Sequence, residues 1–288
     1  MGPRRIATAL AALLLVLAVT LAVTGALESG SSAVVDSVDG LAAAAGQTSD
    51  PATPSAAARP TPTDHTVVAL GDSVPSGHAC HCESFPRTYG RLLARRAGGH
   101  VSVSNLAVNG LQTAGLLGQL KLTRVKRAVA GSDIVLITIG ANDFGDHRRQ
   151  VVTGQCGDGG ADCVADELAT LRRHLTTILG TIRALRGNAP TTVLVTGYWN
   201  VFQDGAVALK EVGEPGLRAS LRLTRRANAA IRSASVSGGA HYVDLLAAFE
   251  ASGRDITALL AADGDHPDAA GHVLIAQALL RAGLPRVR

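Results

Sequence analysis

The sequence predicts an α/β domain in which helices cover both faces of a parallel sheet. From residue 66 onward, five short apolar runs rich in β-branched residues alternate with longer amphipathic stretches. Continuous apolar runs are typical of strands buried on both faces, and strands that alternate with helices form parallel sheets. Aromatic residues make up only 3% of the chain, so we expect an aliphatic core.

The expected elements follow one another in a regular order. Strands are expected at 67–70, 101–107, 134–139, 192–196 and 241–245. Helices are expected at 85–97, 112–129, 165–186, 217–235 and 268–283. Asp268 is a suitable N-cap for the last helix. Ligands bind beyond the carboxyl ends of the strands in such sheets, so the residues that follow the strands are site candidates.

Ser73 follows the first strand directly, within Gly71-Asp72-Ser73. A serine here is also typical of a turn or a helix N-cap, so the triplet alone is weak evidence. A serine becomes a nucleophile when a base takes its proton and a carboxylate orients that base.

The segment Asp263-Gly264-Asp265-His266-Pro267 precedes the last helix and offers such a base. Asp263 lies three residues before His266, so a single turn brings their side chains together. We expect the side chain of Asp265, the immediate neighbour of His266, to point away. Seen alone, His266 also fits a histidine at a helix start.

Two further strands end in residues that suit an oxyanion site. Gly110 follows the second strand, and glycine lets a backbone N–H come close to a ligand, although it also suits a turn. Asn142, in Gly140-Ala141-Asn142-Asp143 after the third strand, places a carboxamide donor at the same edge as Ser73. Asparagine is common in caps and turns as well. Each motif alone is weak evidence for a functional site, but all four are expected at the same edge of the same sheet, which favours a site there.

Together these motifs resemble the four blocks of the SGNH hydrolase superfamily of GDSL-like lipases and esterases, over about residues 66–283. The resemblance implies a three-layer, flavodoxin-like α/β/α sandwich with a five-stranded parallel sheet. The implied triad is Ser73, His266 and Asp263. The implied oxyanion hole comprises the backbone N–H groups of Ser73 and Gly110 and the side chain of Asn142. No metal or organic cofactor is implied.

The expected function is therefore hydrolysis of carboxylic esters, with lipid or simple acyl esters favoured. A polysaccharide O-acetylesterase is an alternative. The few aromatic residues argue against a stacking platform for sugars, although Tyr198 and Trp199 follow the fourth strand. A non-catalytic wall- or glycan-binding relative is another alternative, against which the intact site residues count. Pro75 occupies the place of the second glycine of an α/β-hydrolase elbow, and no phosphate-binding glycine loop follows the first strand.

The N-terminal residues predict export. A basic start and an uncharged run at 6–27 are typical of a signal peptide or a membrane anchor, which places the rest outside the cytoplasm. Residues 28–65 are rich in Ala, Ser, Thr and Pro and predict a disordered linker. The hydrolase domain then spans 66–288. We expect a monomer of actinobacterial type, secreted or tethered through 6–27, with a small-molecule or lipid ester as its substrate.

The four cysteines fit an exported protein. Cys156 and Cys163 bracket a Gly/Asp loop, which favours a disulfide between them and leaves Cys80 to pair with Cys82. We expect the stretch 144–163, held by this disulfide, to form the rim of the site. The cluster His78-Ala79-Cys80-His81-Cys82 contains zinc-ligand types, but its spacing matches no usual zinc pattern. The net charge of +4 is spread out, and no aromatic residues interleave with the arginines, which argues against nucleic-acid binding.

Overall fold

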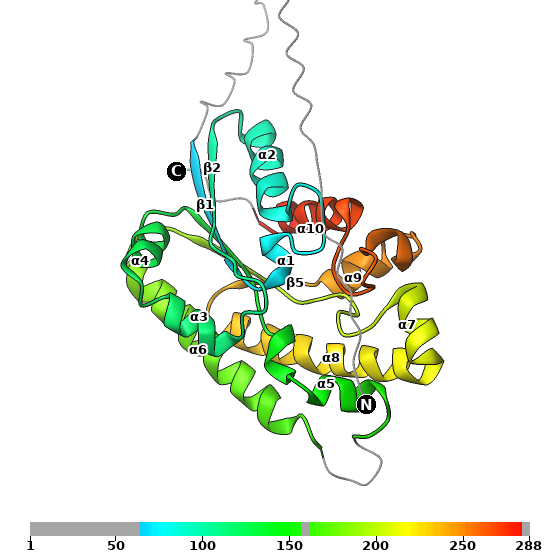
Figure 1. Cartoon of the computed structure of the whole chain (residues 1–288). Coiled ribbons are helices and arrows are strands. Elements are labelled where there is room, and N and C mark those ends of the chain that lie inside the picture. The colour runs from blue at the N-terminus through cyan, green and yellow to red at the C-terminus, as the bar shows by residue number, and fades with distance from the viewer. Residues whose placement is uncertain (1–63, 157–161, 284–288) are drawn as a thin grey trace, which may run out of the picture. The chain divides into compact units, whose positions relative to one another are not determined.

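Five parallel strands form the centre of the molecule in the computed structural model, which describes residues 64–156 and 162–283 (Figure 1). The strands are β1 (His65–Gly71), β2 (Val101–Asn105), β3 (Ile134–Thr138), β4 (Thr192–Thr196) and β5 (His241–Val243). Their order across the sheet is β2-β1-β3-β4-β5, and all neighbours are parallel. The predicted fold class is confirmed.

Helices cover both faces of the sheet (Figure 1). One face carries α2 (Phe85–Ala97), α9 (Leu245–Glu250) and α10 (Ala269–Ala282). The other carries α3 (Thr113–Gln119), α4 (Thr123–Ala130), α6 (Ala165–Arg186) and α8 (Gly213–Ser237). The shorter helices are α1 (Ser73–Ser76), α5 (His147–Val152) and α7 (Gly205–Glu211), with 3-10 turns at Ala141–Phe144 and Ile256–Leu259.

The core is mainly aliphatic and is centred on β1 and β3. Every residue of β3 is buried, whereas β2 alternates between exposed and half-buried residues. The expectation that all five strands are buried on both faces is wrong for β2, because it is an edge strand and only one of its faces packs on a helix, α2.

Several element boundaries differ from the expected ones, three of them for a clear local reason. The helix expected at 112–129 is divided into α3 and α4, because the chain turns at the buried Leu120 and both helices thereby reach the core. Strand β5 stops at Val243 because the carboxylate of Asp244 accepts a hydrogen bond from the Ala247 N–H (3.0 Å) and begins α9. Helix α8 starts at Gly213, earlier than expected, with a proline in its first turn, where proline is tolerated.

The N-terminal segments expected to be a leader or anchor, and most of the expected linker, lie outside the described residues. Within the described ranges, none of the helices is long and apolar enough to span a bilayer.

Candidate active site

Ser73 begins α1, at the point where the strand order reverses between β1 and β3. Such a reversal opens a crevice at the carboxyl edge of a parallel sheet. Gly71 ends β1 with φ of +138°, and a Cβ there would overlap the carbonyl oxygen of Thr138. The N–H of Asp72 donates to the same oxygen at 3.1 Å. Glycine is therefore needed for β1 to deliver Ser73 this close to β3.

Asp72 is fully buried beside the candidate nucleophile. Its carboxylate accepts hydrogen bonds from the Val74 N–H at 3.0 Å and from the hydroxyl of Tyr198. Burial raises the pKa of Asp72 to about 6, although these two hydrogen bonds act in the opposite direction. The Tyr198 hydroxyl also accepts a hydrogen bond from the Ala141 N–H (3.3 Å), so it connects the turn before Ser73 with the loop after β3.

The two aromatic residues after β4 belong to the core. Tyr198 is 1% exposed and Trp199 is 0% exposed. Trp199 stacks on Phe249 with the ring centroids 4.9 Å apart. Neither ring is available as a platform for a sugar. Their position at the strand end was visible in the sequence, but their direction was not.

Hydrogen bonds hold Gly110 between Gly71 and Asn142. The N–H of Val108 donates to the carbonyl oxygen of Gly71 at 2.9 Å, and Nδ2 of Asn142 donates to that of Leu111 at 3.2 Å. The loop that contains Gly110 is therefore fixed to the strand end before Ser73 on one side and to Asn142 on the other.

Three hydrogen-bond donors at this edge remain free for a ligand. Within the described residues, the backbone N–H groups of Ser73 and Gly110 have no acceptor, and Asn142 uses one of its two carboxamide hydrogens on Leu111. Gly110 has φ of +72° with open space around its Cβ position, so its backbone conformation alone favours glycine. Two backbone N–H groups and one carboxamide are suitable donors for an oxyanion.

Asp143 joins the same two loops from the interior. Its carboxylate accepts hydrogen bonds from the N–H of Thr113 (3.1 Å) and from the hydroxyl of Thr113, which lies 2.9 Å from Nδ1 of His174. Burial raises the pKa of Asp143, and the hydrogen bonds from Thr113 partly offset that effect. We did not predict this network from the sequence, where its members lie far apart and form no pattern.

His266 lies between two carboxylates. Its Nδ1 is 2.9 Å from Oδ2 of Asp263 and 2.6 Å from Oδ1 of Asp265. The contact with Asp263 has hydrogen-bond geometry, and Asp265 also acts on the ring at the same nitrogen. The expectation that Asp265 points away is wrong, because the chain turns at Gly264 (φ +76°) and brings both carboxylates to the same nitrogen.

The carboxylates determine the basicity of His266. Burial lowers the pKa of the ring, but Asp265 and Asp263 outweigh it and raise the pKa to about 8. Burial raises the pKa of Asp263, but hydrogen bonds from His266 and from the N–H of Asp265 leave it below its usual value. A ring that donates Nδ1–H to a carboxylate leaves Nε2 free to accept a proton.

His78 bridges Ser73 and His266. Its N–H donates to the carbonyl oxygen of Ser73 at 3.0 Å. Its ring lies edge-on to the ring of His266, with the centroids 5.0 Å apart. Within the described residues, no hydrogen bond joins Ser73 Oγ to His266, so proton transfer requires the two side chains to approach each other, as is common in ligand-free enzymes. The sequence had drawn attention to His78 only as a zinc-ligand type.

In the part of the chain that the structure describes, two clusters contain residue types that bind metals. The sulfurs of Cys80 and Cys82 lie within 4.8 Å of a ring nitrogen of His272, but they are joined in a disulfide and so provide no thiolate ligand. Asp263, Asp265 and His266 form the second cluster, in which Nδ1 of the histidine is already hydrogen-bonded to a carboxylate. Both arrangements are better explained by the contacts described above than by a metal.

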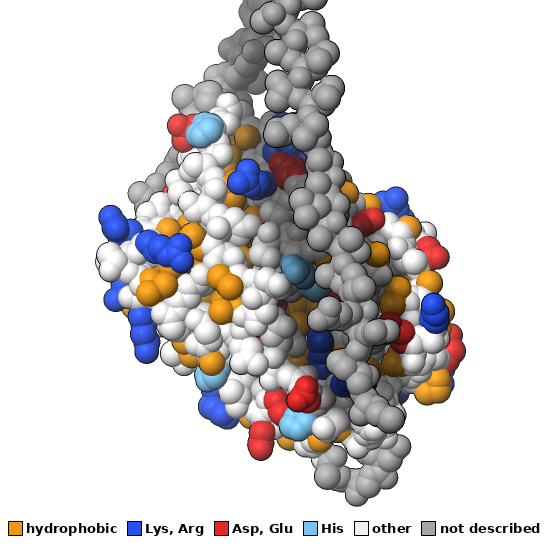
Figure 2. Space-filling model, viewed as in Figure 1, with side chains coloured by type: hydrophobic (Ala, Val, Ile, Leu, Met, Phe, Trp, Pro, Cys, Tyr) orange, Lys and Arg blue, Asp and Glu red, His pale blue; other side chains and the backbone are white. Residues whose placement is uncertain are grey.

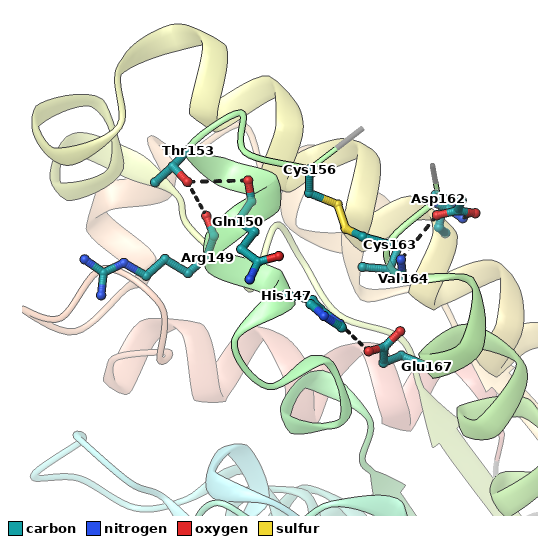
Figure 3. Close-up of a disulfide and its surroundings, with 10 residues drawn as sticks. His147, Arg149, Gln150, Thr153, Cys156, Asp162, Cys163, Val164 and Glu167 are labelled. Atoms are coloured by element: carbon teal, nitrogen blue, oxygen red, sulfur yellow. Dashed lines mark hydrogen bonds and ion pairs between the residues drawn. A yellow bond between two sulfur atoms is a disulfide. The ribbon is translucent and has the colours of Figure 1, made fainter. Parts of the chain in front are cut away.

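The rim of the site is held by a disulfide and two ion pairs, and Figure 3 shows the disulfide and the pair of His147 with Glu167. Cys156 and Cys163 form the disulfide that the sequence favours, with their Cα atoms 6.1 Å apart. His147 of α5 pairs with Glu167 of α6. Asp162 pairs with an arginine of α8. The segment that follows Asn142 is therefore fixed to both long helices.

Two cavities adjoin the candidate residues. One of about 550 Å³ is lined by Ser76, Gly77, Cys82, Glu83, Ser84, Arg87, Asn105 and Ala107. The other, of about 370 Å³, is lined by Asn142, Gly145, Asp146, Arg148 and Arg149. The first adjoins the turn after Ser73, and the second begins at the carboxamide candidate for the oxyanion. Both are suited to hold parts of a small substrate.

Comparison with known proteins identifies the family of the chain. The model of the GDSL-like Lipase/Acylhydrolase family matches residues 69–274, a range that contains the candidate triad and oxyanion residues. No curated protein sequence matches the chain.

Solved structures share the fold at low identity. The lipase Lip_vut3 from a goat rumen metagenome is 20% identical, with a TM-score of 0.65, over 78% of this chain and 100% of its own. Phospholipase A1 from Streptomyces albidoflavus NA297 is 23% identical, with a TM-score of 0.56, over 76% of this chain and 99% of its own. A variant of Axe2, an acetyl xylan esterase from Geobacillus stearothermophilus, is 20% identical, with a TM-score of 0.52, over 78% of this chain and 97% of its own.

Proposed function

Because the chain belongs to the GDSL-like lipase/acylhydrolase family, we propose that Ser73 is the nucleophile of a carboxylic ester hydrolase, with His266 as its base and Asp263 as the residue that orients the base. The observation that carries the assignment is the position of His266. Its Nδ1 is bonded to Asp263, and its ring contacts His78, whose backbone is bonded to Ser73.

The reaction proceeds through an acyl-enzyme. Neutral His266 takes the proton of Ser73 Oγ at Nε2 as the oxygen forms a bond to the ester carbonyl carbon. The tetrahedral intermediate collapses, the bond to the alcohol breaks, and the alcohol leaves with the proton held by His266. Water then attacks the acyl group, with the same histidine as base, and the acid and free Ser73 are released.

The oxyanion of each tetrahedral intermediate is stabilised by the N–H groups of Ser73 and Gly110 and by the carboxamide of Asn142. At the crevice between β1 and β3, the two backbone N–H groups have no acceptor within the described residues, and the carboxamide of Asn142 has one hydrogen left to donate. Preorganised donors of this kind are effective because they need no reorientation as charge develops.

The substrates we propose are lipid or simple acyl esters. The burial of Tyr198 and Trp199 supports this choice, because these rings, the aromatic pair after β4, are not available for stacking on a sugar. The names of the structural neighbours include lipases and an acetyl xylan esterase, so fold similarity does not distinguish these substrate classes.

Hydrolysis of p-nitrophenyl esters from acetate to palmitate, beside the Ser73→Ala variant, tests the proposal. We expect turnover by the wild-type protein and none by Ser73→Ala, and the chain-length optimum separates acetyl from longer acyl esters. Asn142→Ala should lower kcat by about 10²- to 10³-fold, as the loss of one oxyanion donor does elsewhere. Full activity of Ser73→Ala would refute the assignment, and a folded wild-type protein without activity on any ester would favour the non-catalytic binding role.

The proposed location is outside the cytoplasm. The basic, apolar N-terminal sequence and the two cysteine pairs support it, since disulfides persist in oxidising compartments. Fractionation of expressing cells, with immunodetection of the chain, tests this location. Detection in the cytosolic fraction alone would contradict it.

A further inference from the structure

The smaller cavity next to the reaction centre has a basic wall. It opens at Asn142 and is completed by Gly145, Asp146, Arg148 and Arg149. Its volume of about 370 Å³ lies in the range of small-molecule sites. Because Asn142 holds the ester oxygen in the proposed mechanism, groups attached close to the ester carbonyl can enter this space.

The charges in the cavity favour an anion. Arg148 and Arg149 are exposed, and neither forms an ion pair with a carboxylate in the parts of the chain that the structure describes. The lining contains two arginines and a single acidic residue, Asp146. A guanidinium group binds phosphate or carboxylate oxygens through paired N–H donors.

The helix that carries these arginines is fixed from its opposite side. His147 pairs with Glu167 of α6, and the disulfide between Cys156 and Cys163 follows the helix. Figure 3 shows the side chain of Arg149 extending away from both contacts. The backbone that carries the basic wall is therefore held in place, so binding an anion needs only the two arginine side chains to become ordered.

The larger cavity lacks this excess of positive charge. Its lining contains one arginine, Arg87, and one carboxylate, Glu83. Glu83 is also paired with Arg91 at 3.0 Å. A preference for anions is therefore a property of the smaller cavity.

We propose that the cavity at Asn142 is a subsite for an anionic group, a phosphate or a carboxylate, that the ester substrate carries a few bonds from its carbonyl carbon. Arg148 and Arg149 bind this group while the ester lies at Ser73. The inference rests on the ester hydrolysis proposed above, and it adds the chemical class of the substrate.

Two matched pairs of esters test the subsite. One pair is monobutyrylglycerol and its phosphate monoester, which places the anion on the alcohol. The other is p-nitrophenyl butyrate and p-nitrophenyl hemisuccinate, which places it on the acyl group. We expect kcat/KM to be at least about tenfold higher for the anionic member of one pair, as charge-assisted hydrogen bonds provide. The pair that responds identifies the source of the anion.

The double variant R148Q/R149Q should lower this anionic-to-neutral ratio by about tenfold or more. The matched control R124Q/R127Q removes two positive charges from α4, where basic side chains gather at the left edge of Figure 2, far from α5 in Figure 1, and should keep the wild-type ratio.

Hydrolysis of the neutral esters with no preference in either pair, or a preference that survives R148Q/R149Q, would overturn the subsite and leave the ester hydrolase intact. Absence of hydrolysis of all four esters would overturn both proposals together.

Discussion

The aspartate beside the proposed nucleophile and the aspartate beside the proposed base differ in burial, and their pKa values are shifted in opposite directions. On the nucleophile side, Asp72 is fully buried, and its pKa is raised to about 6. On the base side, the Asp263 side chain is 38% exposed, and its pKa is lowered. Both carboxylates accept two or more hydrogen bonds, so the number of hydrogen bonds does not explain the difference.

Burial explains it. Desolvation penalises the ionised form of Asp72, and the neutral donors Tyr198 and Val74 compensate only in part. Asp263 is partly hydrated and faces the ring of His266, which becomes cationic in the proposed mechanism. The comparison indicates that Asp72 maintains the geometry of the nucleophile turn, whereas Asp263 stabilises charge.

Among the changes that test this comparison, the largest effect is expected from Asp263→Asn, which removes the charge that orients and stabilises His266 in the proposed mechanism. A serine-protease triad loses about 10⁴-fold in kcat from this change, and we expect a loss approaching that size, reduced by the remaining charge of Asp265. Steady-state kinetics on p-nitrophenyl butyrate measures it. Asp166→Asn, at an exposed site in the first turn of α6, is the control. A loss of less than tenfold would contradict the role of Asp263.

Asp72→Asn should change how the free energy of unfolding depends on pH. The folded pKa of Asp72 is above its usual value, so the unfolded chain ionises this group first, and its contribution to stability falls as pH rises from about 4 to 6. Relative to Asp72→Asn, the wild-type protein should lose about 2 kcal/mol of unfolding free energy across that interval. Urea unfolding at several pH values measures this difference. A constant difference would show that Asp72 is not desolvated.

Tyr198→Phe should destabilise the fold by about 1–3 kcal/mol, because buried Asp72 and the Ala141 N–H each lose a hydrogen-bond partner. Tyr89→Phe is the matched control. The hydroxyl of Tyr89 is buried and has no hydrogen-bond partner in the described residues, so its removal should cost nothing. Thermal unfolding of both variants measures the contrast, and equal melting temperatures would refute the bridging role.

The smallest effect is expected from Asp265→Asn, which should move the pH profile. His266 acts as a base when neutral, so kcat/KM should rise with pH to a plateau, with a midpoint near the His266 pKa of about 8. Without the charge of Asp265, the midpoint should move to lower pH, toward the usual histidine value. A profile of kcat/KM between pH 5 and 10 measures the shift. An unmoved midpoint would show that Asp265 does not act on the ring.

Sequence patterns were sufficient for the features that depend on local order. Short apolar runs predicted the five strands, and their alternation with helices predicted the parallel arrangement. The residues that follow the strands included the candidates Ser73, Gly110 and Asn142. The spacing of three residues was sufficient to predict that Asp263 and His266 lie together, because a single turn of the chain spans that distance. These predictions depend on residues that are close in the chain or that follow a strand.

The missed features depend on contacts between distant residues. Tyr198 and Asp72 are separated by 126 positions, and no local pattern indicates that the phenol points inward to the carboxylate. The direction of Asp265 depends on the left-handed conformation of Gly264, which the sequence allows but does not require. The contact of His78 with His266 depends on how two loops pack against each other.

The close approach of Gly71 to Thr138 has a consequence for heat inactivation. The backbones of β1 and β3 touch where Ser73 leaves the sheet, and the Asp72 N–H fastens them together. The distance between Ser73 and the Asn142 loop therefore changes only when the two central strands separate. Warming that loosens surface loops should leave this distance intact, and it should be lost only in the cooperative transition that melts the sheet.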